Sequence, residues 1–336
     1  MTRQLFQYHP TFGYHFVPGL RARVEHEGGG YLVRANAQGF RCDRDFAPAK
    51  SADRFRILLF GDSFTAGDGV SNKHRYGDVL EKLVPGLEVY NFGLPGTGTD
   101  QHHLVYRELA REIEHDLVLV AVQVENIRRV TVRYRPFETP AGERHYLAKP
   151  YYTLGEPGEL KLHHVPVPRD PVPLDEVEGG LAQVDTGGRL EWLRRLVHRL
   201  GPDAVEKAQR LLRYQPLPGY RSPDHPDWRL LEAILRAWAA DEAPGPVLVC
   251  PIPVHQYVEG TASSRACWQR FQELETLPNV RVHDLLPSYA KYSRAERRAF
   301  RFGLDPHPTR EGHRVIAESL AGRLAPIVEK NLEHAA

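Results

Sequence analysis

Three side chains from two distant regions of the chain have the types that a nucleophilic hydrolase uses. A Gly61-Asp62-Ser63 turn directly follows a short apolar run, and Asp305-Pro306-His307 stands near the C-terminal end. A serine hydroxyl becomes a useful nucleophile at neutral pH only when a neighbouring base takes its proton and a third group orients that base. Ser63, His307 and Asp305 meet these needs if the fold brings the two regions together.

The spacing of Asp305 and His307 favours such a pairing. Pro306 keeps Asp305 in the extended or polyproline region and fixes its own backbone near extended values. Extended residues two apart project to the same side, so Asp305 can reach one ring nitrogen of His307 while the other faces a nucleophile. Thr309 is expected to cap a helix over residues 310–328 that anchors the pair. Asp62 is suited to hydrogen bonds within its turn.

Five apolar, β-rich runs predict the sheet that must position these groups. Nearly continuous apolar runs are typical of strands covered on both faces, and helical patterns at 76–83 and 100–115 suit parallel crossovers. In such a doubly wound sheet the ligand crevice lies at the carboxyl ends of the strands. Ser63, the 93–98 loop and Asn126 all follow strands at that edge. The five predicted strands are 55–60, 87–92, 117–124, 247–251 and 280–285.

Two regions do not fit this repeating unit. Residues 1–54 are polar and Gly-rich and are expected to form an extension of turns and short strands packed on the core. Residues 55–330 form the predicted hydrolase-like domain, interrupted by an insertion at about 130–240 that carries a proline-rich stretch and helical patterns at 190–212 and 228–239. An insertion of this length can cap the site. A packing or oligomerisation element is the alternative interpretation.

These motifs together resemble the SGNH (GDSL-type) hydrolase superfamily, named for its marker residues Ser, Gly, Asn and His. Gly61-Asp62-Ser63 matches the nucleophile block, and the segment from Asn91 to Gly96 resembles the second block. Glu125-Asn126 resembles the third, and Asp305-Pro306-His307-Pro308 the last. The resemblance implies a three-layer α/β/α fold, in this chain with a five-stranded, mainly parallel, flavodoxin-like sheet. It also implies an oxyanion hole made by the amides of Ser63 and Gly96 and the side chain of Asn126.

The third block departs from the family pattern Gly-x-Asn-Asp. Val124 stands where the family has Gly, and Ile127 where it has Asp. Because the loop can follow a different path without that glycine, Asn126 is the assignment that depends most on the structure.

Composition argues against several other classes of protein. Lys and Arg number 44 against 43 Asp and Glu, a net charge of +1, which gives no long-range attraction for nucleic acid or anionic membranes. The chain has no stretch of about 18 apolar residues, which argues against a membrane span. No signal peptide is visible, so we expect a cytoplasmic protein. Three cysteines, Cys42, Cys250 and Cys267, lack metal-site spacing and are interpreted as reduced thiols.

No metal or cofactor is expected either. The pairs His102-His103 and His163-His164 lack carboxylate partners at ligand spacing and are interpreted as surface histidines. The 93–98 loop lacks the Lys-Ser/Thr ending of a P-loop and the Gly-x-Gly-x-x-Gly pattern of a dinucleotide site. His255 and Tyr257 follow the fourth strand, where they either line the site or pack in a loop. A group of arginines is expected on a solvated helix face: Arg294, Arg297, Arg298 and Arg301.

The leading hypothesis is a serine esterase that removes a short acyl group, often acetyl, from a carbohydrate or another small hydroxylated molecule. The same three residues would make an O-acyltransferase if an acceptor alcohol replaced water. A non-catalytic binding module that retains the fold is the hypothesis from another class. The sequence leaves open the acyl group, the alcohol, the oligomeric state and the pathway.

Overall fold

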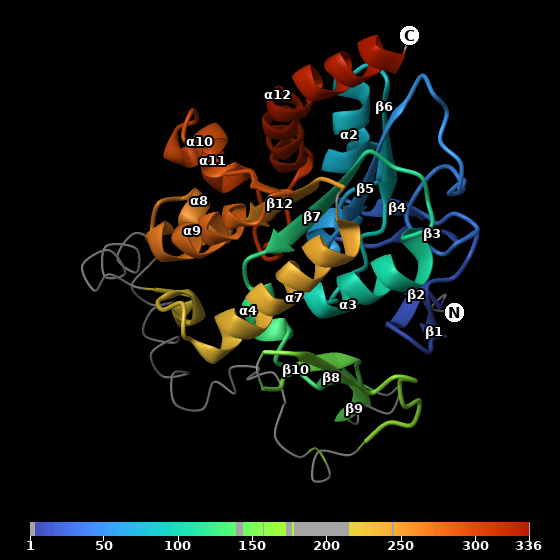
Figure 1. Cartoon of the computed structure of the whole chain (residues 1–336), viewed down its shortest axis with the longest axis vertical. Coiled ribbons are helices and arrows are strands. Elements are labelled where there is room, and N and C mark those ends of the chain that lie inside the picture. Colours follow the sequence, from blue (N-terminus) through green and yellow to red (C-terminus); the bar gives the residue numbers. More distant parts are fainter. Residues whose placement is uncertain are drawn as a thin grey trace.

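A five-stranded parallel sheet forms the centre of the molecule (Figure 1). The computed structural model describes residues 4–138, 144–156, 158–172, 177, 215–243 and 245–335. All neighbouring strands are parallel, in the order β13-β12-β7-β5-β6, which is the flavodoxin-like order of doubly wound sheets. The predicted fold class is thereby confirmed. The strands are β5 (Phe55–Phe60), β6 (Leu87–Asn91), β7 (Leu117–Gln123), β12 (Val247–Ile252) and β13 (Val280–Val282).

Alternate residues of each strand build two separate hydrophobic layers, because successive side chains point to opposite faces. Ile57 and Leu59 pack with α2 (Tyr76–Leu83) and α12 (Arg310–Ala335) on one face. Leu58 and Phe60 pack with α3 (Thr99–Val105) and α7 (Pro226–Glu242) on the other. Figure 1 shows the two helix pairs on opposite faces of the sheet, which gives the three α/β/α layers.

The helix predicted over 100–115 is shorter than expected. After α3 the chain makes a π-helical turn, η2 (Tyr106–Ala110), and the helix ends there. The backbone N–H of Glu114 bonds to the carbonyl oxygen of Pro48 instead of a helical partner, because the chain must turn to enter β7. The helix predicted over 310–328 extends further, to Ala335.

The N-terminal residues form two antiparallel hairpins, β1 (Phe6–His9) with β2 (Gly13–Phe16), and β3 (Arg21–Val24) with β4 (Tyr31–Arg34). They pack on the sheet, since Phe12, Phe16 and Phe40 belong to the same buried cluster as Phe60. The fully buried Arg41 donates hydrogen bonds to the carbonyl oxygens of Gly67 and Val70, at 2.8 and 2.7 Å. The extension is thus bonded to the loop that follows Ser63.

The first part of the insertion forms two more hairpins, β8 (Tyr134–Glu138) with β9 (Arg144–Ala148), and β10 (Tyr151–Leu154) with β11 (Leu160–His163). Val167, just after them, is bonded to the N-terminal hairpin: its N–H donates to the carbonyl oxygen of Pro10 at 2.7 Å, and its carbonyl oxygen accepts from the Tyr8 hydroxyl at 2.8 Å. The helix predicted over 190–212 lies outside the described residues.

Short helices connect the remaining parts. They are α1 (Ser63–Ala66), η1 (Asn72–His74), α4 (Asn126–Arg129), η4 (Pro218–Tyr220), α8 (His255–Val258), α9 (Arg265–Gln272), η5 (Glu273–Thr276), α10 (Leu286–Tyr289) and α11 (Arg294–Ala299).

Two sequence interpretations of polar clusters are wrong. His102 and His103 are buried, because α3 is covered by α7: His103 Nε2 lies 2.9 Å from Asp241 of that helix, and His102 Nε2 lies 2.8 Å from the Thr97 hydroxyl. The arginines of residues 294–301 are half-buried rather than solvated. Arg301, for example, pairs with the buried Glu259 at 2.8 Å.

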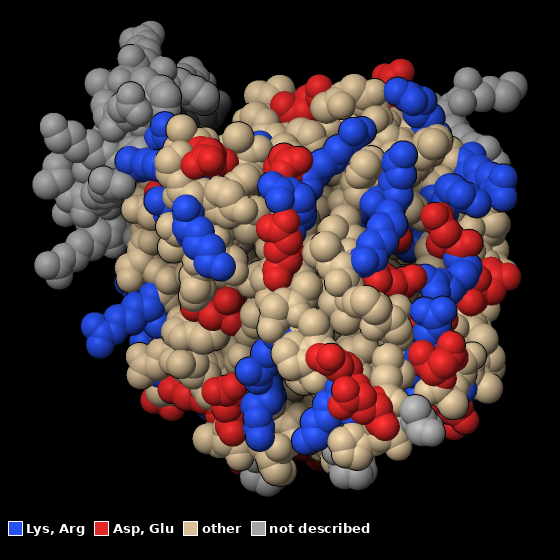
Figure 2. Space-filling view, turned by 90° about the horizontal axis from the view of Figure 1, so that it is seen from above, with Lys and Arg blue, Asp and Glu red and all other residues tan. Residues whose placement is uncertain are grey.

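The surface charge is mixed, in line with the balanced composition. On the face seen in Figure 2, Lys and Arg side chains alternate with Asp and Glu. No helix among the described residues is long and apolar enough to cross a membrane. All three cysteines are free and buried.

Candidate active site

Ser63 lies at the carboxyl end of β5, as the first residue of α1. Asp62 caps this short helix by accepting a hydrogen bond from the Phe64 N–H at 3.0 Å, and its other oxygen lies 2.8 Å from Arg129 Nη1. Burial raises the pKa of Asp62, an effect that the charge of Arg129 opposes. Asp62 therefore holds the turn, and the serine hydroxyl is left for other contacts.

The Ser63 hydroxyl contacts the histidine near the C-terminus. Ser63 Oγ lies 2.7 Å from His307 Nε2, and His307 Nδ1 is hydrogen-bonded to Asp305 Oδ1. The same carboxylate oxygen accepts the backbone N–H of His307 at 2.9 Å. Burial alone would raise the pKa of Asp305, but the hydrogen bonds from His307 and from His26 outweigh it and hold the pKa below its usual range. A hydrogen-bonded line thus runs from serine to histidine to an ionised carboxylate.

A second histidine reaches the same carboxylate from the N-terminal extension. His26 Nε2 lies 3.0 Å from Asp305 Oδ2, and Glu27 accepts the backbone N–H groups of Leu304 and Asp305, at 3.0 and 2.6 Å. Sequence reasoning missed both residues. Their only sequence signal is a pair of polar residues in a Gly-rich loop, which does not reveal a contact across nearly the whole chain.

Residues 300–309 form a tight hairpin-like loop that carries Asp305 and His307. The N–H of Phe302 bonds to the carbonyl oxygen of His307 at 3.1 Å, and that of Thr309 to Phe300 at 2.9 Å. The Thr309 hydroxyl accepts from the Gly312 N–H at 3.3 Å, so it caps α12 as expected. At Gly69, with φ of +85°, a Cβ would lie 2.5 Å from the Phe302 ring. Only glycine lets that ring pack under the loop.

The 93–97 loop lies against the Ser63 turn. The N–H of Leu94 donates to the carbonyl oxygen of Gly61 at 3.0 Å, and the Tyr14 hydroxyl donates to that of Pro95 at 2.5 Å. Gly96 has a φ of +70°, and a Cβ there would overlap Nη2 of Arg135. The positive φ favours glycine at this position, where the Arg135 guanidinium also lies close.

Asn126 follows β7 as the first residue of α4 and is fully buried. Neither its amide nitrogen nor its amide oxygen has a hydrogen-bond partner among the described residues. A buried amide without a partner costs about 1–3 kcal/mol, so this side chain is available to a bound group. Ile127, which departs from the family pattern, is buried in the hydrophobic core.

Asp68 is a further acidic group near the serine that the sequence did not single out. Its backbone N–H bonds to the carbonyl oxygen of Ser63 at 3.0 Å. Burial raises the pKa of Asp68 to about 6, although the charges of Arg41 and His307 oppose the shift. Its charge therefore changes in the range where histidines titrate.

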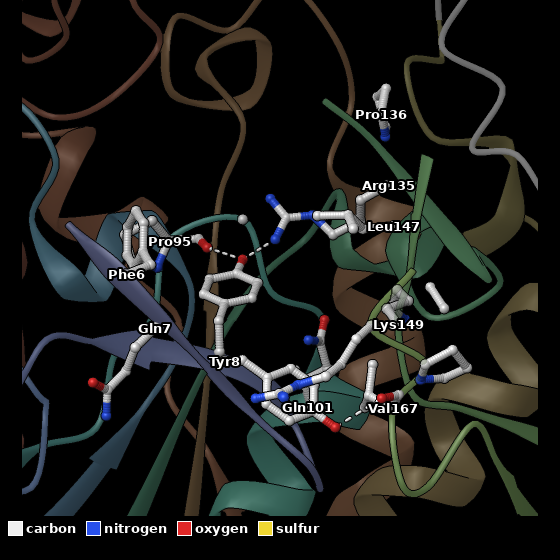
Figure 3. A pocket seen from close by; sticks show the side chains of 16 residues that line it. Phe6, Gln7, Tyr8, Pro95, Gln101, Arg135, Pro136, Leu147, Lys149 and Val167 are labelled. Atoms are coloured by element: carbon white, nitrogen blue, oxygen red, sulfur yellow. Dashed lines mark hydrogen bonds between the residues drawn. The ribbon is translucent and has the colours of Figure 1, made fainter. Parts of the chain in front are cut away.

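Two hollows flank these groups. A small one of about 30 Å³ is lined by Phe64, His255, Pro306 and other residues, whereas Tyr257 belongs to the core. A larger cavity of about 590 Å³ lies beside Gly96, between the N-terminal hairpin and the β8–β9 hairpin (Figure 3). No group of three or more His, Cys, Asp or Glu among the described residues is arranged to hold a metal ion.

Solved structures to which this chain is similar include a lipolytic protein, an esterase and a lipase. A member of the lipolytic G-D-S-L family from Veillonella parvula is 13% identical, with a TM-score of 0.41 over 80% of this chain and 97% of that one. An acetylxylan esterase from Geobacillus stearothermophilus is 13% identical, with a TM-score of 0.44 over 80% and 94%. A lipase/acylhydrolase from Enterococcus faecalis is 13% identical, with a TM-score of 0.42 over 82% and 97%. No protein-family model and no curated protein matches the chain.

Proposed function

We propose that this chain is a serine esterase of the SGNH (GDSL) type, with Ser63 as the nucleophile. The observation that carries the proposal is the hydrogen-bonded line from Ser63 Oγ through His307 to Asp305. The three groups are of the types that nucleophilic catalysis needs: a hydroxyl, a base 2.7 Å from it, and a carboxylate that can fix the tautomer of the base.

In the proposed reaction, Ser63 Oγ attacks the ester carbonyl carbon while His307 Nε2 takes the hydroxyl proton. Asp305 stabilises the imidazolium through Nδ1. When the tetrahedral intermediate collapses, His307 gives the proton to the leaving alkoxide and the acyl group stays on Ser63. Water, activated in turn by His307, then attacks the acyl-enzyme and releases the acid.

The negative oxygen of the intermediate needs donors that are fixed before the reaction. We assign this role to the backbone N–H groups of Ser63 and Gly96 and to the Asn126 amide. The unpartnered amide of Asn126 supports its assignment. For Gly96, support comes from the bond between Leu94 and Gly61, which keeps the loop against the serine turn.

A short acyl group, such as acetyl, on a carbohydrate or similar small molecule is the proposed substrate. The hollow beside Phe64 and Pro306 measures about 30 Å³, roughly the volume of one water molecule, which does not suit a long acyl chain. The cavity beside Gly96, at about 590 Å³, has the size of common small-ligand sites and suits the alcohol half of the ester.

Hydrolysis of p-nitrophenyl acetate tests the proposal. We expect Ser63→Ala and His307→Ala each to lower kcat/KM by at least about 1,000-fold, while Ser51→Ala, at an exposed serine, keeps the wild-type rate. If folded wild-type protein does not hydrolyse the ester, or if Ser63→Ala remains active, the proposal is wrong. Absence of hydrolysis by folded wild-type protein would support the binding-module hypothesis.

Acyl transfer to an alcohol is a second candidate function, because the cavity beside Gly96 also has room for an acceptor. Adding sugar acceptors to the hydrolysis reaction separates the two outcomes. Acylated sugar among the products supports transfer. Product that never contains the acceptor supports hydrolysis.

A further inference from the structure

We propose that the cavity beside Gly96 recognises a carboxylate or a similar anionic group, so that the substrate is an acidic ester, such as that of an acidic sugar. The inference rests on the proposed function, because it assigns this cavity to the substrate of Ser63. The sixteen lining residues include Arg135, Lys149 and Arg169 and no Asp or Glu. In Figure 3, Arg135 and Lys149 project from one side of the cavity and Tyr8 from the other.

The charge of Lys149 is already balanced. Its ammonium pairs with the buried carboxylate of Asp100 and also donates to the carbonyl oxygen of Arg129 at 3.1 Å. Because Asp100 is not among the lining residues, this pair serves as a rigid, nearly neutral part of the wall. The positive charge of the cavity therefore comes from the two arginines.

Arg135 is the principal cation in this cavity. Its guanidinium donates to the Tyr14 hydroxyl and lies 4.9 Å from the centre of that ring. Arg135 forms no ion pair with an acidic residue whose side chain the structure describes. A guanidinium has five N–H donors in a fixed plane, so most of its donors remain for a ligand after one bond to Tyr14. Paired N–H donors in one plane can bind two oxygens of a carboxylate, phosphate or sulfate group at once.

The rest of the cavity suits a ring. Arg169 stacks over the ring of Tyr8, with its guanidinium carbon 4.2 Å from the ring centre, and Tyr8 is held by its hydrogen bond to Val167. Phe6, Leu147 and prolines complete apolar parts of the wall. Flat apolar surfaces with a few fixed polar groups are typical of sites that bind small ring compounds.

Gly96, whose N–H is the proposed oxyanion donor, is one of the residues that line the cavity. Arg129 fixes this geometry: its Nη1 lies 2.8 Å from Asp62 Oδ2 and donates to the carbonyl oxygen of Thr97 at 3.2 Å. Asp62, which precedes Ser63, and Thr97, which follows Gly96, are thus both hydrogen-bonded to the guanidinium of Arg129. An ester whose oxyanion met the Gly96 amide would extend its anionic end towards Arg135.

Equilibrium binding to Ser63→Ala protein tests the inference without turnover. The probes are 4-acetoxybenzoate and its neutral match 4-acetoxybenzamide. We expect the carboxylate to bind at least 10-fold more tightly, and the preference to disappear in Ser63→Ala/Arg135→Gln protein. A double variant with Arg221→Gln, at an exposed arginine outside the cavity lining, should keep it. Arg135→Lys retains the positive charge but not the planar set of N–H donors, so it should keep part of the preference for the carboxylate probe.

Equal binding of the two probes, or a preference that survives in both the Arg135→Gln and the Arg169→Gln background, would overturn the inference. Turnover by wild-type protein then locates the anion: mono-p-nitrophenyl succinate carries it on the acyl half, and 4-acetoxybenzoate on the alcohol half. Preference for 4-acetoxybenzoate over its neutral match supports an anion site for the alcohol half. Preference for the succinate alone, or for neither substrate, counts against it. If hydrolysis did not depend on Ser63 while the binding preference persisted, only the proposed function would fail.

Discussion

Asn126 links stability and function at the level of single residues. Its buried, unpartnered amide is a cost to the folded protein that a bound oxyanion would offset. The identity of Asn126 as a candidate was accessible from the sequence, because it follows a strand at the carboxyl edge of the sheet. Its lack of partners was not, since that depends on the side chains that surround it.

Replacing Asn126 by alanine should therefore separate activity from stability. We expect kcat for p-nitrophenyl acetate to fall by about 100- to 1,000-fold, as for the loss of one oxyanion donor. The free energy of unfolding, measured by urea denaturation, should stay equal or rise, because the variant no longer buries an unpaired amide. A variant with kcat within a few-fold of wild type would exclude Asn126 from the oxyanion hole.

Asp68 should make the folded state less stable as its carboxyl ionises. Its pKa is about 6 in the folded protein and about 3.9 in an unfolded chain. Between these values the folded state binds more protons at Asp68, so the contribution of this carboxyl to the unfolding free energy falls as pH rises. Relative to wild type, Asp68→Asn should gain about 1–2 kcal/mol across this window, allowing for partial exposure of the side chain.

Urea denaturation of both proteins at pH 4 and pH 7 measures this effect. The difference in unfolding free energy should be small at pH 4 and constant above about pH 7. A wild type that gained stability relative to Asp68→Asn as pH rose would contradict a raised pKa for this carboxyl.

At the level of elements, the loop of residues 300–309 depends on the N-terminal hairpins. The strands themselves were predictable, because parallel strands covered on both faces appear as apolar runs. The pairing of Asp305 with His307 followed from the proline between them. The contact of His26 with Asp305 leaves no local pattern, because it joins residues at opposite ends of the chain that only the tertiary fold brings within 3.0 Å.

His26 should act as a positioning residue for Asp305. His26→Phe keeps a ring against Phe302, which His26 contacts edge-to-face at 4.4 Å, but removes the hydrogen bond to the carboxylate. We expect kcat to fall by about 10-fold, because hydrogen bonds to charged groups contribute about 1.5–3 kcal/mol, while KM for p-nitrophenyl acetate is unchanged.

His26→Gln is the matched control, since its amide can still donate to Asp305. It should recover most of the lost kcat. Equal kcat values for the Phe and Gln variants would mean that the hydrogen bond of His26 does not position Asp305.

At the level of the whole molecule, buried histidines tie stability to pH. The two hydrophobic layers enclose His102 and His313, and burial lowers the pKa of each to about 3. His313 Nδ1 accepts the Tyr76 N–H at 3.2 Å, which requires an unprotonated nitrogen. The sequence did not reveal the burial of His102, because two adjacent histidines in a polar segment are typical of a surface helix.

We therefore expect the protein to lose stability as pH falls below the unfolded histidine pKa of about 6.5. In this range the unfolded state binds more protons than the folded state, so the unfolding free energy rises with pH. The two histidines together should contribute on the order of 2–4 kcal/mol between pH 5 and pH 7.5. His102→Gln/His313→Gln should show a weaker pH dependence in urea denaturation, and an unchanged slope would contradict this expectation.

Labelling with a fluorophosphonate probe, followed by mass spectrometry of the modified peptide, tests most directly whether the chain is a serine hydrolase. The probe phosphonylates a serine whose hydroxyl is activated by a neighbouring base. We expect one label, on Ser63, and none on Ser63→Ala protein, with much slower labelling of His307→Ala. Folded wild-type protein that takes up no label at Ser63, together with ester hydrolysis that survives Ser63→Ala, would contradict the proposed mechanism.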